Sequence, residues 1–169
     1  MAARTAHEAW ALIIAASDWA WLEAIDPAWD LFEMDVDAWN ASRVPARLGA
    51  AFAATKRPGL HLAVITKVLH IKRPRMFPVL DSVVVAQVGA PISDDIATWV
   101  NAMGHVRAVG RSNLAGLTQV RDYLEQQGIR DRSLVRILDG LVWVSSPGAG
   151  LFAHLVGWER VIRPWRDEG

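Results

Sequence analysis

Cysteine is absent from this 169-residue sequence, and tyrosine occurs only once. Without cysteine the chain has no disulfide, no thiol nucleophile and no thiolate metal site. Lysine plus arginine and aspartate plus glutamate number 18 each, so the formal net charge is zero. The overall charge therefore provides no attraction to DNA, to a membrane surface or to an acidic partner, and any electrostatic binding site must be local.

Long apolar runs are also missing. No uninterrupted run reaches the roughly 20 residues that a bilayer span needs. The N-terminal stretch 1–21 is partly apolar, but charged or titratable residues interrupt it, namely Arg4, His7, Glu8 and Asp18. We interpret it as an amphipathic helix and not as a signal peptide. These features predict a cytoplasmic protein with no membrane partner.

The sequence is rich in apolar residues, at 52%, and in tryptophan, which occurs nine times. We interpret most of these tryptophans as core packing, because each buries a large area whatever else it does. The length fits one domain with a substantial core. No repeat, low-complexity tract or long linker divides the chain, so the sequence predicts a single domain over 1–169.

Helix signals occur along almost the whole chain. Apolar spacing predicts helices over 4–16 and 18–25, ending at Asp26-Pro27, and more helix over 28–54 with an interruption at Val44-Pro45. Residues 60–71 are apolar on nearly all sides, which predicts a central, buried helix.

The second half continues the pattern. Asp81 is a candidate N-cap for 82–90, although the valines there would also allow a strand. Three further helices are predicted to begin after Ser93, to end at Gly128, and to end at Ser146-Pro147. A last short helix is predicted for 151–162. No hairpin turn signals occur, so the predicted fold class is all-α.

One stretch gathers charge, "ITKVLHIKRPRMFPVLDSVV" at residues 65–84. Within it Lys72, Arg73 and Arg75 lie in a loop stiffened by two prolines. These side chains would either clamp phosphates through paired hydrogen bonds or tie the loop to Asp139, for which Arg136 is the nearer partner.

Residues 58–84, "PGLHLAVITKVLHIKRPRMFPVLDSVV", resemble the hairpin-to-aspartate segment of the helix-hairpin-helix base-excision DNA glycosylases. The turn Pro58-Gly59-Leu60-His61 stands where that family has Pro-Gly-Val-Gly, and 79–84 stands where it has its aspartate stretch. The resemblance implies a single-domain helical fold of that kind and backbone contact to a DNA phosphate at Gly59. His61 replaces the second glycine, and its side chain would crowd or contact the phosphate.

The same residues 65–84, together with "SLVRILDGLVW", look like an uncharacterised bacterial family, domain of unknown function 6308. That family brings no established activity with it.

Two residues are catalytic candidates. The glycosylase resemblance places Asp81 where a carboxylate activates water or stabilises the sugar cation, although helix capping also accounts for it. The lysine of strand-cleaving relatives falls at Ala63, so lyase chemistry does not carry over. Lys67 lies one turn further on and would be either a buried nucleophile or base, or a side chain that reaches solvent or pairs with a carboxylate.

His61 and His70 lie nine residues apart and point to opposite sides of one helix, so they cannot share a metal. The sequence predicts no metal site and no cofactor.

Taken together, these features predict a nucleic-acid-associated helical protein with DNA as its partner. It would be a glycosylase-like hydrolase without lyase activity or a degenerate relative that binds without cutting, so enzymatic activity stays open. The alternative is a non-enzymatic interaction module or a small-ligand-binding protein with a small-molecule or protein partner. A glycosylase would place the loop 72–75, Arg107 and Arg111 on one side, beside a cleft that holds Asp81.

Overall fold

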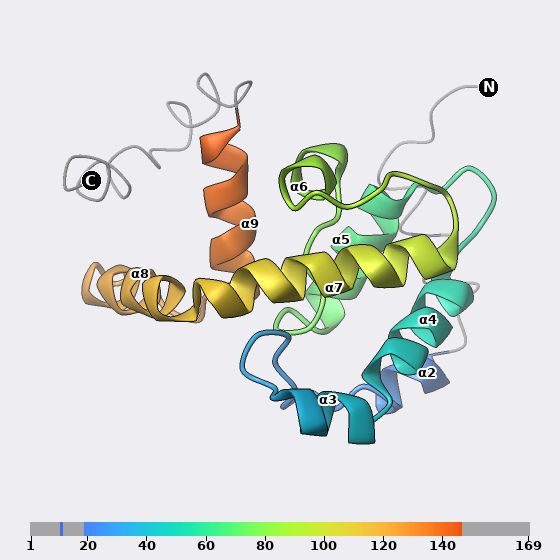
Figure 1. Cartoon of the computed structure of the whole chain (residues 1–169), viewed down its shortest axis with the longest axis horizontal. Helices are drawn as coiled ribbons and strands as arrows, with labels where there is room; N and C mark the ends of the chain where they lie inside the picture. The colour runs from blue at the N-terminus through green and yellow to red at the C-terminus, as the bar shows by residue number, and fades with distance from the viewer. Residues whose placement is uncertain (1–10, 12–18, 147–169) are drawn as a thin grey trace.

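The computed structural model describes residues 11 and 19–146 of the chain. Within them it contains helices and no strand, which confirms the all-α prediction for this part of the chain (Figure 1). The helices are α2 (Ala20–Glu23), α3 (Val36–Ala41), α4 (Val44–Thr55), α5 (Leu62–Lys72), α6 (Ser82–Gln87), α7 (Ile96–Ser112), α8 (Leu114–Gln126) and α9 (Leu134–Ser145). The helices predicted for 4–16 and 151–162 lie largely or wholly outside the described residues.

The long helix α7 crosses the middle of the molecule and organises the rest (Figure 1). One side of it packs against α4, which also contacts α2 and α3. Helix α9 rises from the other side, near the junction of α7 and α8, and contacts α6, α7 and α8. The loop after α5 connects the two halves of the chain, because its Arg75 pairs with Asp30 and its Pro74 carbonyl accepts a hydrogen bond from Ser133, just before α9.

Short polar residues begin several of these helices. Asp81 accepts hydrogen bonds from the backbone N–H groups of Val83 and Val84 at 3.0 and 2.9 Å, so its predicted capping role is confirmed and 82–87 forms a helix. The cap of α7 is Asp95 and not Ser93, because the Asp95 carboxylate accepts from the Thr98 N–H at 3.0 Å. Gly128 has a φ of +80° just after α8, as its predicted role at the helix end requires.

Residues 24–35 form turns where the sequence predicted helix. Their aspartates bind nearby backbone N–H groups, since Asp26 accepts from Ala28 and Asp30 accepts from Phe32 and Glu33. Such local bonds compete with helical hydrogen bonds. The predicted break at Asp26-Pro27 is therefore the start of a longer irregular segment.

Helix α5 is central on one side only. Ile65, Val68 and Leu69 are fully buried, whereas Lys67 is exposed and Ile71 is 60% exposed. The prediction of a central, buried helix is therefore confirmed for the face that carries Ile65, Val68 and Leu69. Its outer face is open in the described part of the chain.

Aromatic side chains fill much of the core, as the tryptophan content suggested. Trp99 and Phe77 both pack edge-on against Phe52, with ring centroids 5.5 and 5.9 Å away. Phe32 lies against the backbone of Gly110 in α7, where a β-carbon would come within 2.3 Å of the phenyl ring. Aromatic burial thus fixes how closely the irregular segment 24–35 approaches α7.

Candidate functional site

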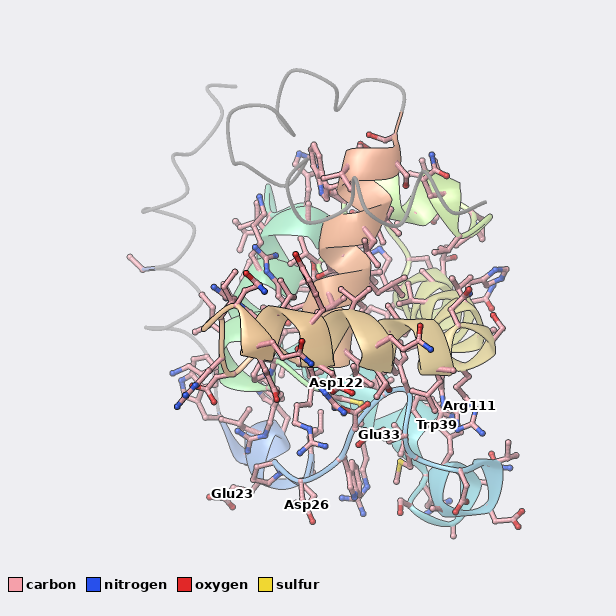
Figure 2. All side chains as sticks on the ribbon, turned by 90° about the vertical axis from the view of Figure 1, so that its left-hand side faces the viewer. Glu23, Asp26, Glu33, Trp39, Arg111 and Asp122 are labelled. Carbon is pink, nitrogen blue, oxygen red and sulfur yellow. The ribbon has the colours of Figure 1, made fainter. Side chains whose placement is uncertain are left out.

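A cavity of about 560 Å³ opens where the loop after α2, the end of α5, the side of α8 and the start of α9 meet. Its volume lies within the range of small-molecule sites. Most of its lining is charged or polar: Asp30, Glu33, His70, Pro74, Arg75, Arg121, Asp131, Arg132, Ser133, Leu134 and Arg136. Figure 2 shows this side of the molecule, with Glu33 on the loop below α8 and Asp122 on the helix itself.

Two carboxylates on one wall are already paired. Asp30 is only 5% exposed, and its second oxygen lies 3.2 Å from Nε of Arg75. Glu33 lies 3.1 Å from the Arg75 guanidinium and 3.8 Å from that of Arg121. Pairing of this kind is what a buried carboxylate requires. Arg75 and Arg121 thus hold the irregular segment against the loop after α5 and against α8.

Two further arginines of the lining form no ion pair with a described residue. Arg132 and Arg136 line the cavity, and neither side chain makes an ion pair or a hydrogen bond in the structure of the described residues. Between them Ser133 caps α9, since its hydroxyl accepts from the Arg136 N–H at 3.1 Å and donates to the Pro74 carbonyl at 2.8 Å. The start of α9 is therefore fixed to the loop while two guanidinium groups stay available.

His70, near the end of α5, completes the lining. Its Nδ1 lies 2.6 Å from the carbonyl oxygen of Phe77, so Nδ1 carries a proton and Nε2 is the ring nitrogen left for a ligand. Burial lowers the pKa of His70, and the positive charge of Arg136 lowers it further, while the bond to Phe77 acts in the opposite direction. The imidazole is therefore neutral at pH 7.

The basic loop predicted from the sequence is divided in its contacts. Arg75 belongs to the cavity, whereas Arg73 donates to the carbonyl oxygens of Ile25 and Leu22 at 2.9 and 2.8 Å. The Lys72 ammonium lies 5.2 Å from the ring centre of Trp19. Of the three side chains, Arg73 makes the most hydrogen bonds with backbone carbonyl oxygens.

The predicted ion pair between this loop and Asp139 is wrong. Arg75 pairs with Asp30 and Glu33, and Asp139 instead accepts a hydrogen bond from the Val79 N–H at 3.0 Å. The nearer candidate, Arg136, points to the exposed side of α9 while Asp139 is 2% exposed. The acids that the loop binds come from the irregular segment 24–35, more than 40 residues earlier in the sequence.

The remaining predicted site residues lie on α5 or in the turn before it. Gly59 has a φ of +79° in the turn before the helix, and His61 is its exposed N-cap residue. Helix α5 has 11 residues, so His61 and Lys72 are separated by about 16 Å. Lys67 is exposed, which leaves it without the burial that a nucleophilic amine would use. The set predicted to bind nucleic acid is thus spread over both ends of the helix.

Asp81 lies outside the cavity lining and interacts with Asp139 and Trp143 of α9. Its second oxygen accepts a hydrogen bond from Nε1 of Trp143 at 2.9 Å. Burial raises the pKa of Asp139 to about 7, and the negative charge of Asp81 adds to this effect, while the Val79 N–H and Arg136 oppose it. Asp81 therefore caps α6 and joins α6 to α9 at once.

Arg107 and Arg111 bind the irregular segment. Arg111 donates to the carbonyl oxygens of Phe32 and Met34 at 3.0 and 2.6 Å, and Arg107 donates to that of Met34 at 2.6 Å. Burial lowers the pKa of Arg107, with the positive charge of Arg111 adding to the effect and Asp35 opposing it. These arginines hold the backbone, and Figure 2 labels Arg111 near Trp39 on that side of the molecule.

Residues 11 and 19–146 contain no group of three or more histidine, aspartate or glutamate side chains placed to hold a metal ion. In the same residues no helix has the length and apolarity needed to cross a membrane.

Sequence reasoning missed most of the cavity. It named Arg75, and it treated His70 only as half of a metal pair and Arg136 only as a partner for Asp139. Asp30 and Glu33 were not identified from the sequence, although their position on either side of the apolar Leu31 and Phe32 was the available signal. Nothing local indicates that this segment meets a loop more than 40 residues later.

Comparison with known proteins places the chain in a family. Residues 4–146 match the model of a family of unknown function, DUF6308. No curated protein and no solved structure shows a significant match, so the likeness to helix-hairpin-helix glycosylases has no support from these comparisons. Since the match extends over most of the sequence, the chain belongs to the DUF6308 family.

Proposed function

We propose that the protein binds a small phosphorylated molecule in the arginine-lined cavity. The observation that carries this proposal is the pair Arg132 and Arg136, whose guanidinium groups line the cavity and form no ion pair or hydrogen bond in the described residues. Guanidinium groups match the oxygens of a phosphate with paired, charge-assisted hydrogen bonds. The proposal is the small-ligand alternative that the sequence left open.

The charge balance of the cavity supports an anion as the ligand. Asp30 and Glu33 already offset Arg75 and Arg121. Arg132 and Arg136 then remain with a single further carboxylate in the lining, that of Asp131. A phosphate would supply the missing negative charge, and a cavity of about 560 Å³ leaves room for the rest of a metabolite-sized molecule.

Replacing Arg132 and Arg136 by glutamine tests the proposal. We expect isothermal titration calorimetry to detect saturable binding of at least one of inorganic phosphate, phenyl phosphate, glucose 6-phosphate and AMP to the wild-type protein. Each substitution should weaken that binding by about tenfold or more, because a hydrogen bond to a charged group contributes about 1.5–3 kcal/mol. Neither should lower the free energy of unfolding by more than about 0.5 kcal/mol, since neither side chain has an ion pair or hydrogen bond to lose.

Arg130→Gln is the matched control, because Arg130 is exposed and lies outside the cavity lining. It should bind like the wild-type protein. Equal affinity in all the variants, or no saturable binding of any of the four compounds, would contradict the proposal. Binding of citrate in preference to all of them would identify the ligand as a carboxylate, and so would contradict the phosphate assignment.

Nucleic-acid association, with base-excision activity, is the second candidate function. One observation favours it: Asp81 lies at the start of α6 and accepts a hydrogen bond from Trp143, a tryptophan that is 39% exposed. The start of a helix is where the glycosylase resemblance expects the carboxylate that activates water or stabilises the sugar cation.

The Asp81→Asn variant tests this candidate and also measures the structural role of the residue. Asparagine has one side-chain oxygen, so it can either cap α6 or accept from Trp143, and we expect a loss of stability of about 1 kcal/mol in urea denaturation. If Asp81 is catalytic, glycosylase activity on duplexes with damaged bases should collapse while DNA binding persists.

Asp95→Asn is the control for capping, since the Asp95 carboxylate bonds only to Thr98 in the first turn of its own helix among the described contacts. It should be nearly neutral in stability, because asparagine caps as well as aspartate. Undiminished cleavage in Asp81→Asn would remove the catalytic assignment. Absence of cleavage and of DNA binding in the wild-type protein would remove the second candidate altogether.

A further inference from the structure

We infer that the cavity selects a phosphate monoester over a phosphodiester because His70 takes up a proton when a doubly charged phosphate enters. This inference rests on the proposed function and names its ligand class. It also makes His70 a specificity-determining residue.

The geometry of the lining provides the first argument. The Phe77 carbonyl occupies Nδ1 of His70, so Nε2 is the nitrogen that a ligand can meet. A protonated Nε2 would add a third donor to the guanidinium groups of Arg132 and Arg136. A monoester presents three terminal oxygens to such donors, whereas a diester presents two.

Electrostatics provides the second argument. Burial and the nearby charge of Arg136 lower the pKa of His70, so the imidazole of the empty cavity is neutral at pH 7. A dianion beside the ring would reverse the effect of Arg136 and raise this pKa, drawing a proton from solution. A diester has one negative charge and would raise it less.

Other ionisable groups surround His70, and they bear on any pH dependence. The cavity lining also contains four arginines and three carboxylates: Arg75, Arg121, Arg132, Arg136, Asp30, Glu33 and Asp131. Histidine is the residue type among these whose ordinary pKa lies nearest to neutrality. Asp139 lies outside the lining but also has a pKa of about 7 and interacts with Arg136, so its contribution must be separated from that of His70.

The test compares phenyl phosphate with methyl phenyl phosphate, which differ by one methyl group and one charge. We expect calorimetry to show phenyl phosphate binding about fivefold or more tightly as the pH falls from about 8 to 6.5, because uptake of one proton changes affinity up to tenfold per pH unit. Methyl phenyl phosphate should bind more weakly and change less than twofold. Titrations in buffers of different ionisation enthalpy should give proton uptake for the monoester.

His70→Asn is the informative variant, since its amide can still donate to the Phe77 carbonyl while the titratable nitrogen is lost. It should bind phenyl phosphate with a nearly constant affinity from pH 8 to 6.5, and Asp139→Asn should keep the wild-type pH dependence. Should His70→Asn fail to fold, NMR titration of the His70 ring in the wild-type protein must show a higher pKa with phenyl phosphate bound. Equal, pH-independent binding of both esters would overturn this inference alone, whereas no binding of either at any pH would overturn the proposed function with it.

Discussion

The Asp139→Asn variant should be more stable than the wild-type protein at pH 8, by about 2–3 kcal/mol, although it removes a charge that a neighbouring arginine favours. The reason is the cost of ionising this carboxyl where it lies. Asp139 is 2% exposed, and one of its oxygens has no hydrogen-bond partner among the described residues. Asparagine keeps the oxygen that accepts from the Val79 N–H and resembles the protonated acid in shape.

The pH dependence of the wild-type protein follows from the same shift. Burial raises the pKa of Asp139 from 3.8 to about 7 in the folded state. Between these values Asp139 binds more protons in the folded protein than in the unfolded chain, so its contribution to stability falls as the pH rises from about 4 to about 7. Asp139→Asn should lack this contribution.

Urea denaturation of both proteins at intervals from about pH 5 to pH 8 would measure the effect. Asp37→Asn provides a control at an exposed aspartate, whose effect should be small throughout. A stability difference between wild type and Asp139→Asn that does not change over this range, or an Asp139→Asn variant less stable than the wild type at pH 8, would show that the buried carboxyl is better accommodated as an anion than the structure indicates.

Gly110→Ala should destabilise the protein by about 2 kcal/mol or more, despite the higher helix propensity of alanine. The added β-carbon would lie 2.3–2.5 Å from three ring carbons of Phe32, a side chain that is fully buried. Phe32 has little room to yield, because the backbone around it is held by Arg111 and by the Asp30 carboxylate. The substitution must therefore move the segment 24–35 or α7.

Gly104→Ala is the matched control on the same helix, since a β-carbon there would meet nothing within 4 Å. It should stabilise the protein by about 0.5–1 kcal/mol, the ordinary gain of alanine over glycine in a helix. Chemical denaturation of the two variants beside the wild type gives both values. Similar effects at the two positions would mean that Phe32 does not pack against Gly110 as described.

The sequence by itself determined those features that depend on neighbouring residues. Apolar spacing predicted helices, and Asp81 and Gly128 were recognised as helix ends because a carboxylate can bind free N–H groups and glycine adopts positive φ. Prolines 27 and 45 marked true interruptions. The same local rules failed for 24–35, where apolar spacing predicted a helix. There aspartate side chains accept hydrogen bonds from the backbone N–H groups instead.

Charge pairing was decided only by the tertiary structure. The loop residues Arg73 and Arg75 were recognised as a cluster, but their partners are carbonyl oxygens of Leu22 and Ile25 and the carboxylates of Asp30 and Glu33. An arginine can bind any acid or carbonyl group that the fold brings within about 3 Å. The sequence offered Asp139 as a partner for the loop, whereas Arg75 pairs with Asp30 and Glu33.

The cavity depends on tertiary structure for the same reason. Its walls come from four segments between Asp30 and Arg136, and no periodicity or cap signal links them. What makes Arg132 and Arg136 candidates for binding is that α9 is anchored through Ser133 to the loop at Pro74 while their guanidinium groups form no ion pair or hydrogen bond in the described residues. Helix propensity and capping are encoded within a few residues, whereas an unsatisfied charge can be recognised only once every neighbour in space is known.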